Sequence, residues 1–115
     1  MTLEKNFIKK FEENLSRNVK LSSYSWFNLG GNADYFFKAN DKNHLKEFLQ
    51  EAVSKNLKVT ILGAGSNTLF RDNGVRGAVV KLGKEFSFIK KIDENTLEVG
   101  AATLDRKVAN YAKDN

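Results

Sequence analysis

The segment VTILGAGSNTLF, residues 59–70, decides how the rest of the chain is interpreted, because an apolar run enters two glycines one residue apart. The apolar run predicts a strand, and the glycines predict a sharp turn after it. Backbone without side chains lets several N–H groups converge on one anion, and Ser66 and Asn67 add short hydrogen-bond donors beside them. Residues 63–67 are therefore either a phosphate-binding loop or a turn between two strands.

Two familiar phosphate-binding patterns do not fit this segment. A dinucleotide-binding fingerprint needs a third glycine where this chain has Thr68, and a helix where the turn residues 72–74 follow. A P-loop needs lysine after its last glycine, whereas Gly65 is followed by Ser66. The pattern alone leaves both interpretations open.

Upstream of the loop, residues 1–19 are expected to form an N-terminal helix. Their apolar residues recur on one helical face, namely Leu3, Phe7, Ile8, Phe11 and Leu15. Gly30 and Gly31 mark a place where the backbone bends or is approached closely. Residues 33–39 alternate and are rich in aromatic side chains, which favours a strand.

A second helix is expected between Asp41, a suitable N-cap, and Asn56, a suitable left-handed stop. Its predicted buried stripe consists of Leu45, Phe48, Leu49, Ala52 and Val53. A strand over residues 58–62 follows. This strand–helix–strand order is expected to bring two parallel strands together by a crossover.

Downstream of the loop, residues 72–74 predict a turn, Gly77 follows it, and residues 78–82 predict a third strand. Residues 86–92 and 96–101 flank Asp-Glu-Asn and predict a hairpin. A last helix is expected from Thr103, with an apolar face of Leu104, Val108, Tyr111 and Ala112. No strand follows that helix for a crossover, so we expect the fold to be interrupted at the end of the chain. The fold class is α+β.

Composition excludes several classes of function. The 115 residues suit one domain, or a part of a larger protein, and contain no cysteine for disulfides or thiolate metal sites. With a single histidine, His44, no metal site is expected. The net charge of +5 comes from lysines spread along the chain, which does not favour nucleic acid as a partner. We expect no membrane partner and a cytoplasmic location, since no apolar span or signal segment is evident.

Three stretches, WFNLGGNADYFF (26–37), VTILGAGSNTLFRDNGVRGAVVKL (59–82) and LEVGAAT (97–103), together resemble the opening of the UDP-N-acetylenolpyruvoylglucosamine reductase (MurB) family. The resemblance runs from about Ser22 to the end of the chain. Its most specific part is the glycine segment followed by Asp72, Gly74 and Gly77. Asn32 departs from the family, which usually has proline there.

The resemblance implies an FAD-binding domain of the vanillyl-alcohol-oxidase (PCMH) type, built from two α+β subdomains. Residues 20–84 would form the first subdomain, with its strand–helix–strand unit, and residues 85–115 the truncated start of the second. The implied cofactor-binding residues, which wrap the FAD diphosphate, are Gly63, Ala64, Gly65, Ser66 and Asn67. The complete enzymes of the family use NADPH to reduce the flavin and then a UDP-sugar substrate in peptidoglycan synthesis.

The resemblance places the catalytic residues after Asn115, so no catalytic residue is assigned and the chain alone is expected to be inactive. FAD is expected to be non-covalent, because His44 matches no flavin-linking position. Uncovered strand edges make self-association an expected property of a truncated chain. Two alternatives remain: part of another sugar or alcohol flavin oxidoreductase, and a stand-alone anion- or nucleotide-binding module.

Other residues near these motifs have a structural and a functional interpretation. Arg71 and Arg76 are candidates to neutralise a diphosphate, although exposed arginines near turns are common. Asp72 is better explained as a turn former than as an acid or base. Trp26 and Phe27 are expected to fill the core rather than to contact a cofactor.

Overall fold

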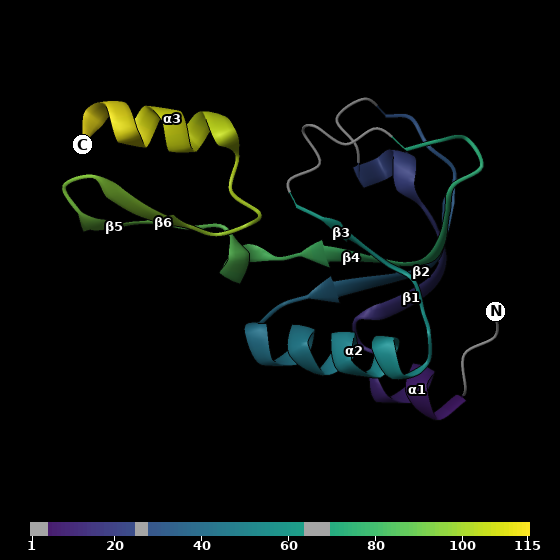
Figure 1. Cartoon of the computed structure of the whole chain (residues 1–115). Coiled ribbons are helices and arrows are strands. Elements are labelled where there is room, and N and C mark those ends of the chain that lie inside the picture. Colours follow the sequence, from purple (N-terminus) through teal and green to yellow (C-terminus); the bar gives the residue numbers. More distant parts are fainter. Residues whose placement is uncertain (1–4, 25–27, 64–69) are drawn as a thin grey trace.

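The centre of the structure is a four-stranded mixed sheet, seen in a computed structural model that describes residues 5–24, 28–63 and 70–115 (Figure 1). The strand order is β1 (Leu15–Lys20), β2 (Asn32–Ala39), β4 (Val75–Leu82) and β3 (Val59–Leu62). The other elements are α1 (Lys5–Lys10), α2 (Lys42–Ser54), β5 (Ile89–Asp93), β6 (Thr96–Val99), α3 (Asp105–Asp114) and two 3₁₀ turns, η1 (Leu21–Tyr24) and η2 (Lys84–Phe86).

The strand–helix–strand prediction is confirmed for the parallel direction of its strands and is wrong about their pairing. β2 and β3 are joined through α2, but β4 lies between them and pairs in parallel with both. The reason lies in β4 itself, whose consecutive residues Ala78, Val79 and Val80 are all fully buried. Such a strand needs cover on both faces, which a central position in the sheet supplies.

The prediction of a helix over residues 1–19 is wrong beyond Lys10. α1 ends there, and Leu15–Lys20 forms β1, antiparallel to β2, with Leu15 opposite Phe37. The side-chain amide of Asn14 donates to the Lys38 carbonyl at 2.9 Å and holds the entry to this strand. The spacing of Leu15 suits both a helical face and a strand residue above the same core. Pairing with the edge of β2 satisfies backbone groups that an isolated helix extension leaves to water.

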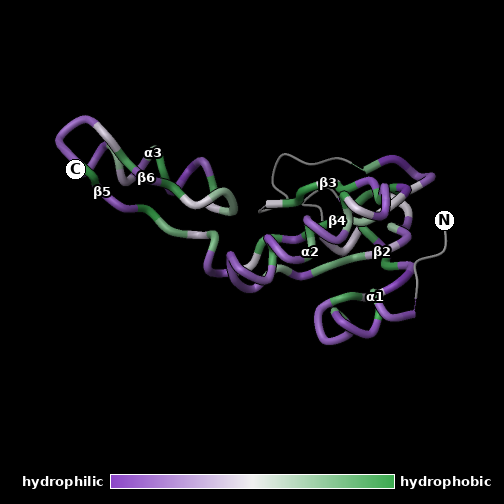
Figure 2. The backbone as a smooth tube through the Cα atoms, turned by 60° about the horizontal axis from the view of Figure 1, so that its bottom comes forward, coloured by the Kyte–Doolittle hydropathy of each residue, from purple (hydrophilic) through white to green (hydrophobic). Residues whose placement is uncertain are grey.

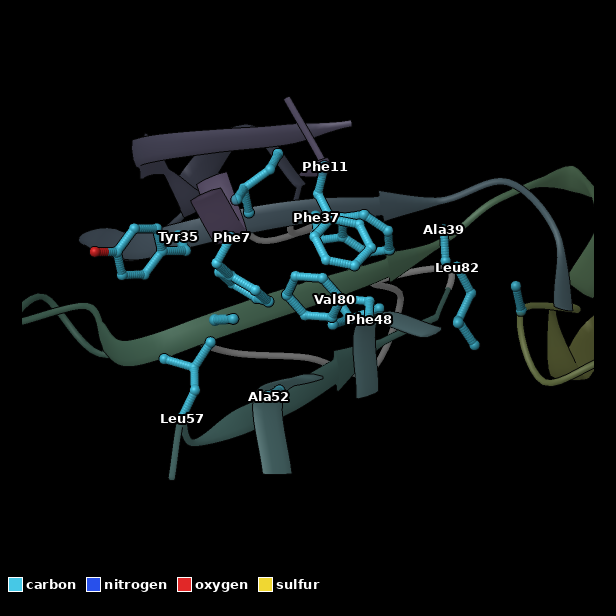
Figure 3. Close-up of a cluster of buried hydrophobic side chains, with 13 residues drawn as sticks. Phe7, Phe11, Tyr35, Phe37, Ala39, Phe48, Ala52, Leu57, Val80 and Leu82 are labelled. Atoms are coloured by element: carbon cyan, nitrogen blue, oxygen red, sulfur yellow. The ribbon is translucent and has the colours of Figure 1, made fainter. Parts of the chain in front are cut away.

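One face of the sheet carries an aromatic core, covered by α1 and α2 (Figures 1 and 3). The rings of Phe37 and Phe48 are stacked with their centroids 4.1 Å apart. Phe11 lies edge-on to both, at 5.6 Å from Phe37 and 5.2 Å from Phe48. Phe7 completes the group at 5.2 Å from Phe11. The predicted burial of Phe7 and Phe11 is thus confirmed, although Phe11 lies in the turn that follows α1.

The opposite face of the sheet is also apolar. Its buried cluster consists of Leu21, Ala33, Phe36, Leu62, Phe70 and Val79. Tyr24 in η1 packs against it, with its ring centroid 4.4 Å from that of Phe36. The consecutive residues Tyr35, Phe36 and Phe37 in β2 are therefore all buried, which is characteristic of an interior strand with both faces covered.

The limits of α2 agree with the sequence. Asp41 is the N-cap, and its carboxylate accepts a hydrogen bond of 2.7 Å from the His44 backbone N–H. Asn56 adopts φ 55°, the left-handed conformation expected after a helix. In the predicted stripe Phe48 and Ala52 are buried, but Val53 is 76% exposed and its prediction is wrong. Its position on the helix turns it beyond the edge of the face that meets the sheet.

Replacing the N-cap tests this local account. Asp41→Ala should lower the free energy of unfolding by about 1 kcal/mol, because the His44 N–H loses its partner and the helix dipole loses a favourable charge. Urea denaturation followed by circular dichroism measures the difference. Asn43→Ala, an exposed change in the same helical turn, is the matched control and should have a much smaller effect. Equal midpoints for the Asp41 variant and the parent would contradict the capping role.

Two predicted turns meet beside the start of β2. Gly31 donates to the Arg71 carbonyl at 2.9 Å, and a Cβ at Gly31 would overlap the Asp72 carbonyl oxygen. Gly74, with φ 78°, closes the turn from Arg71 and lies against the backbone of Asn32. The predicted close approach at the paired glycines and the predicted turn at residues 72–74 are both confirmed. Both depend on backbone-to-backbone contacts that a side chain would prevent.

β5 and β6 form a separate two-stranded sheet, which confirms the predicted hairpin. The last helix begins at Asp105 rather than Thr103. The Thr103 hydroxyl instead accepts from the Phe88 N–H at 3.0 Å and is within donating distance, 3.1 Å, of the Phe88 carbonyl, which ties the chain to the hairpin. Figure 2 shows the hairpin and α3 at the end of the molecule opposite the N-terminus. Within the described ranges, no helix has the length and apolar character to cross a membrane.

Candidate cofactor-binding cleft

The carboxyl ends of the three parallel strands meet at one edge of the sheet. β2 ends at Ala39, β3 at Leu62 and β4 at Leu82. Gly63 and Gly83 follow the last two of these strands directly. In open sheets with parallel strands, ligands bind outside the carboxyl ends, where loops separate and backbone groups point outward. The glycine segment singled out in the sequence therefore leaves the sheet at its functional edge.

Gly63, the first residue of that segment, contacts neighbours on two sides. Its carbonyl oxygen accepts a hydrogen bond from the Lys81 ammonium of β4. A Cβ at Gly63 would lie 3.0 Å from the Ala101 carbonyl oxygen, so a side chain would crowd the chain after β6. The other predicted cofactor-binding residues, Ala64, Gly65, Ser66 and Asn67, lie outside the described residues, as do Trp26 and Phe27.

Beside Gly63 lies a cleft of about 510 Å³ between the end of β4 and the start of α3. Four lysines from different parts of the chain line it: Lys38, Lys81, Lys84 and Lys107. No acidic residue is among the described lining residues. Leu82, Ala102 and Leu104 supply an apolar wall. The cleft is thus basic on one side and apolar on the other.

Lys38 and Lys81 are the centre of this positive charge. They occupy paired positions on the neighbouring parallel strands β2 and β4. Partial burial lowers the pKa of Lys81, and the positive charge of Lys38 lowers that pKa further. Both effects disfavour the ammonium form, and an anion placed between the two side chains would oppose both.

The residues of the cleft fit a dinucleotide cofactor such as FAD. The ammonium groups are donors for a diphosphate, and the apolar wall suits a ring or ribityl chain beside it. Gly63 lies next to this lining, because its carbonyl oxygen accepts from the Lys81 ammonium. The lining combines positive charge and apolar surface in one place, which is the chemistry that such a ligand requires.

The remaining candidates lie elsewhere. Arg76 forms an ion pair of 3.2 Å with Asp34 and donates to the Asn32 and Asn73 carbonyls, so it fixes the turn before β4. Arg71 is exposed and does not line the cleft. His44 is half-buried rather than at the solvent edge of its helix, with its ring centroid 4.9 Å from that of Phe37. Within the described residues, no group of three or more possible metal ligands forms.

The sequence interpretation did not identify the lysine pair. A signal was present, because both strands end in the same pattern: Phe36-Phe37-Lys38-Ala39 and Val79-Val80-Lys81-Leu82. A charged residue between buried residues, one position before a strand ends, indicates a place near the carboxyl end of the strand where one face of the sheet is no longer covered by apolar side chains. Only the pairing of β2 with β4 shows that the two lysines are neighbours.

Comparisons with known proteins identify the family of this chain. The UDP-N-acetylenolpyruvoylglucosamine reductase of Orientia tsutsugamushi (strain Ikeda) is 45% identical over 98 residues, which are 83% of this chain and 32% of that protein. The same-named protein of Phenylobacterium zucineum is 45% identical over 85% of this chain and 32% of its own length. The crystal structure of UDP-N-acetylenolpyruvylglucosamine reductase (MurB) from Thermus caldophilus matches with a TM-score of 0.60 and 28% identity, over 85% of this chain and 33% of that chain.

The chain thus spans about a third of the length of the curated relatives that it matches. These similarities confirm the predicted resemblance to the UDP-N-acetylenolpyruvoylglucosamine reductase (MurB) family. They also confirm the α+β fold class of an FAD-binding domain. A family model described as FAD binding domain matches residues 33–115, a range that contains all of β2 except its first residue, the glycine segment and all four lysines of the cleft. The chain therefore belongs to the FAD binding domain family.

Proposed function

We propose that the chain is the FAD-binding part of a UDP-N-acetylenolpyruvoylglucosamine reductase, a cytoplasmic enzyme that uses NADPH to reduce its UDP-linked enolpyruvyl sugar in peptidoglycan synthesis. The similarity to proteins of that name over 83–85% of this chain supports it. The structural observation that carries it is the position of Gly63. The glycine segment leaves the sheet at the carboxyl edge, beside a basic cleft with an apolar wall.

In this proposal residues 63–67 hold the diphosphate of FAD through backbone N–H groups, and the lysine side of the cleft faces the same group. The bound flavin would supply hydride transfer to the enolpyruvyl double bond. Binding is non-covalent, since His44, the one histidine, packs against Phe37 and Phe11, and Phe37 lies on the face of β2 opposite the side chain of Lys38. The chain's own residues bind and orient the cofactor.

The chain alone is proposed to lack reductase activity, because its relatives are about three times longer and no catalytic residue is assigned to it. Self-association is also proposed. Phe88, Ile92 and Val99 of the hairpin region are large apolar side chains with 37% to 53% of their surface exposed. Exposed apolar residues on a two-stranded sheet with open edges favour contact with a second copy.

A chimaera tests the proposed function directly. The segment of the Orientia reductase that aligns with this chain is replaced by this chain, and the purified chimaera is assayed for bound FAD and for NADPH oxidation dependent on the enolpyruvyl UDP-sugar. We expect FAD at about one per protein and measurable reductase activity. The isolated chain should show none under the same conditions.

A second chimaera carrying Gly65→Val is the matched variant. It should fold but lose most of its FAD, because a β-branched side chain interferes with the approach of the diphosphate to the backbone. A folded first chimaera without flavin would contradict the FAD-binding role. Normal FAD but no activity would favour part of another flavin oxidoreductase. Turnover by the isolated chain would contradict the proposed division of function.

A further inference from the structure

We propose that the chain associates with a second copy of itself by pairing the outer edge of β3 with the outer edge of β6 of the other copy. The inference rests on the self-association in the proposed function and deepens it by naming the two strands that meet. It uses no residue of the cofactor cleft. Main-chain hydrogen bonds between two edge strands would join the two sheets.

β3 is an edge strand whose outer side is open to pairing. Among the described residues it pairs with β4 alone, in regular parallel register from Val59 to Leu62. None of its four residues is charged and none is proline, although edge strands commonly use both to resist pairing. The other edge strand of this sheet, β1, contains Asn18 with φ 53°, which interrupts its extended backbone. The regular edge is therefore that of β3.

Ile61 gives this edge an exposed apolar side chain. Val59 packs against the buried cluster on the α2 face of the sheet, and Ile61 shares that face because it is two residues further along the strand. Ile61 also lies opposite Val80 of β4, which belongs to the same cluster. Val80 is fully buried but Ile61 is 51% exposed, since the described residues place no strand on its other side. A further strand at this edge would cover it.

α2 adds exposed apolar surface on the same side of the molecule. Leu49 and Val53 are one helical turn apart, and Val53 is mostly exposed. The opposite flank of α2 carries Glu47 and Glu51, which bind Lys10 of α1, and Figure 1 shows the two helices side by side. Because the segment of α1 covers the β2 side of the sheet, the flank with Val53 is turned toward β3.

Lysines surround this edge and decide which strand can pair with it. Lys58 directly precedes β3, and Lys42 and Lys46 continue the flank of Leu49 and Val53 at helical spacing. All three lysines are exposed. A second β3 at this edge would bring the same positive charges together, which disfavours pairing of β3 with itself. The edge therefore favours a strand that carries acidic residues.

β6 is a strand of this chain with the complementary charge. It contains Glu98, follows the acidic residues Asp93 and Glu94, and among the described residues pairs with β5 alone. β5 is less suited, because it carries two adjacent lysines. Residues 84–115, which include the hairpin, contain six basic and six acidic residues, so the whole net charge of +5 lies in residues 1–83. Net charge thus does not oppose the approach of the hairpin to β3.

One antiparallel register matches all four positions of the two strands. Its pairs are Val59 with Val99, Thr60 with Glu98, Ile61 with Leu97 and Leu62 with Thr96. The two purely apolar pairs lie on the α2 face, and Glu98 lies on the opposite face together with Lys58, two positions from its partner and within reach of a long side chain. The acidic turn before β6 then lies beyond the end of β3, at the edge of the sheet where α2 begins with its lysines.

The contact joins two different surfaces, which fixes how association depends on concentration. A pair of copies keeps one free β3 edge and one free β6 edge, so further copies can add. Four paired residues span only about 13 Å of each strand. An interface of this size is smaller than that of a stable dimer, so we expect weak association that grows with concentration.

Sedimentation velocity of the whole chain over a range of concentrations measures this contact. The variants are Lys58→Glu and Glu98→Lys, each alone and in an equimolar mixture. Lys20→Glu on β1 and Glu12→Lys in the turn after α1 are the matched controls, because both positions are exposed and the changes in net charge are the same. Thermal unfolding followed by circular dichroism checks that each variant is folded.

The parent should sediment with an average mass that rises with concentration, and added salt should weaken its association by screening the charges. Each single variant should associate about tenfold more weakly, because like charges then meet across the contact. The equimolar mixture should recover the association of the parent, because the two reversed charges meet between unlike chains. The controls should change the association less than about twofold.

Equal association of the parent and both variants overturns the proposed contact, and so does a mixture that associates no more strongly than its separate components. A parent that stays monomeric at millimolar concentration also overturns it, as does an association that salt strengthens, since apolar contacts behave in that way. None of these results bears on FAD binding by the chimaera. A flavin-free chimaera beside an unchanged, charge-dependent association overturns the proposed cofactor role and leaves the strand contact standing.

Discussion

Phe37→Ala is expected to lower the free energy of unfolding by about 3–5 kcal/mol. Phe37 is fully buried in β2, stacked on Phe48 and edge-on to Phe11, so its removal leaves a cavity among three elements (Figure 3). Phe11 comes from the turn after α1 and Phe48 from α2, so one small shift does not close the cavity, because each ring is held by its own backbone. A typical domain has a free energy of unfolding of about 5–15 kcal/mol, so the loss of this one ring removes a large part of that stability.

Urea denaturation followed by far-ultraviolet circular dichroism measures the change in the free energy of unfolding. Val53→Ala is the matched control, because it also removes apolar side-chain volume but at a position that is 76% exposed. The control should change stability by less than about 0.5 kcal/mol. A Phe37 variant within about 1 kcal/mol of the parent would show that the aromatic cluster does not form the core.

Gly74→Val is expected to abolish the native fold. Gly74 has φ 78°, a region that β-branched residues rarely adopt, and a Cβ there would overlap both the nitrogen and the oxygen of Asn32. Neither neighbour is a side chain that can rotate away, since both belong to the backbone at the start of β2. The turn would have to open, and β4 would lose its register with β2.

The loss is measured by the dispersion of amide resonances and by the cooperativity of thermal unfolding. Asn73→Ala in the same turn is the control, because Asn73 has an exposed side chain and contributes its backbone carbonyl to Arg76. The control should keep dispersed resonances and a cooperative transition. A Gly74 variant with the spectrum of the parent would contradict the described contact between this turn and Asn32.

Local signals in the sequence were sufficient for most elements. Asp41 caps α2 by accepting a hydrogen bond from the His44 backbone N–H, and Asn56 ends the helix through its own left-handed backbone conformation. Residues 72–74 form their turn through the hydrogen bond from the Gly74 N–H to the Arg71 carbonyl and the positive φ of Gly74. These predictions succeeded because the interactions that decide them join residues only a few positions apart. The same holds for the hairpin around Asp93, whose carboxylate accepts from the Asn95 N–H at 2.8 Å.

The predictions failed where two segments competed for one place. Leu15 has the spacing of a helical face, yet residues 15–20 became a strand because the edge of β2 was open to pair with them. β3 was expected beside β2, yet β4 took the position between them because it has three consecutive buried residues, whereas β3 has a single buried residue, Leu62. Periodicity reports which residues are apolar, but not which partner covers them.

By itself the sequence determined the limits of α2, the turn at residues 72–74, the α+β class and the glycine segment after a strand, because each follows from chemistry within a few residues. The tertiary structure alone decided that Lys38 and Lys81 stand side by side and that Lys81 reaches the Gly63 carbonyl. Lys38 and Lys81 are far apart along the chain, and only the parallel pairing of β2 with β4 brings their charges together. The candidate site depends on that pairing, since neither lysine alone distinguishes itself from the other lysines of a basic chain.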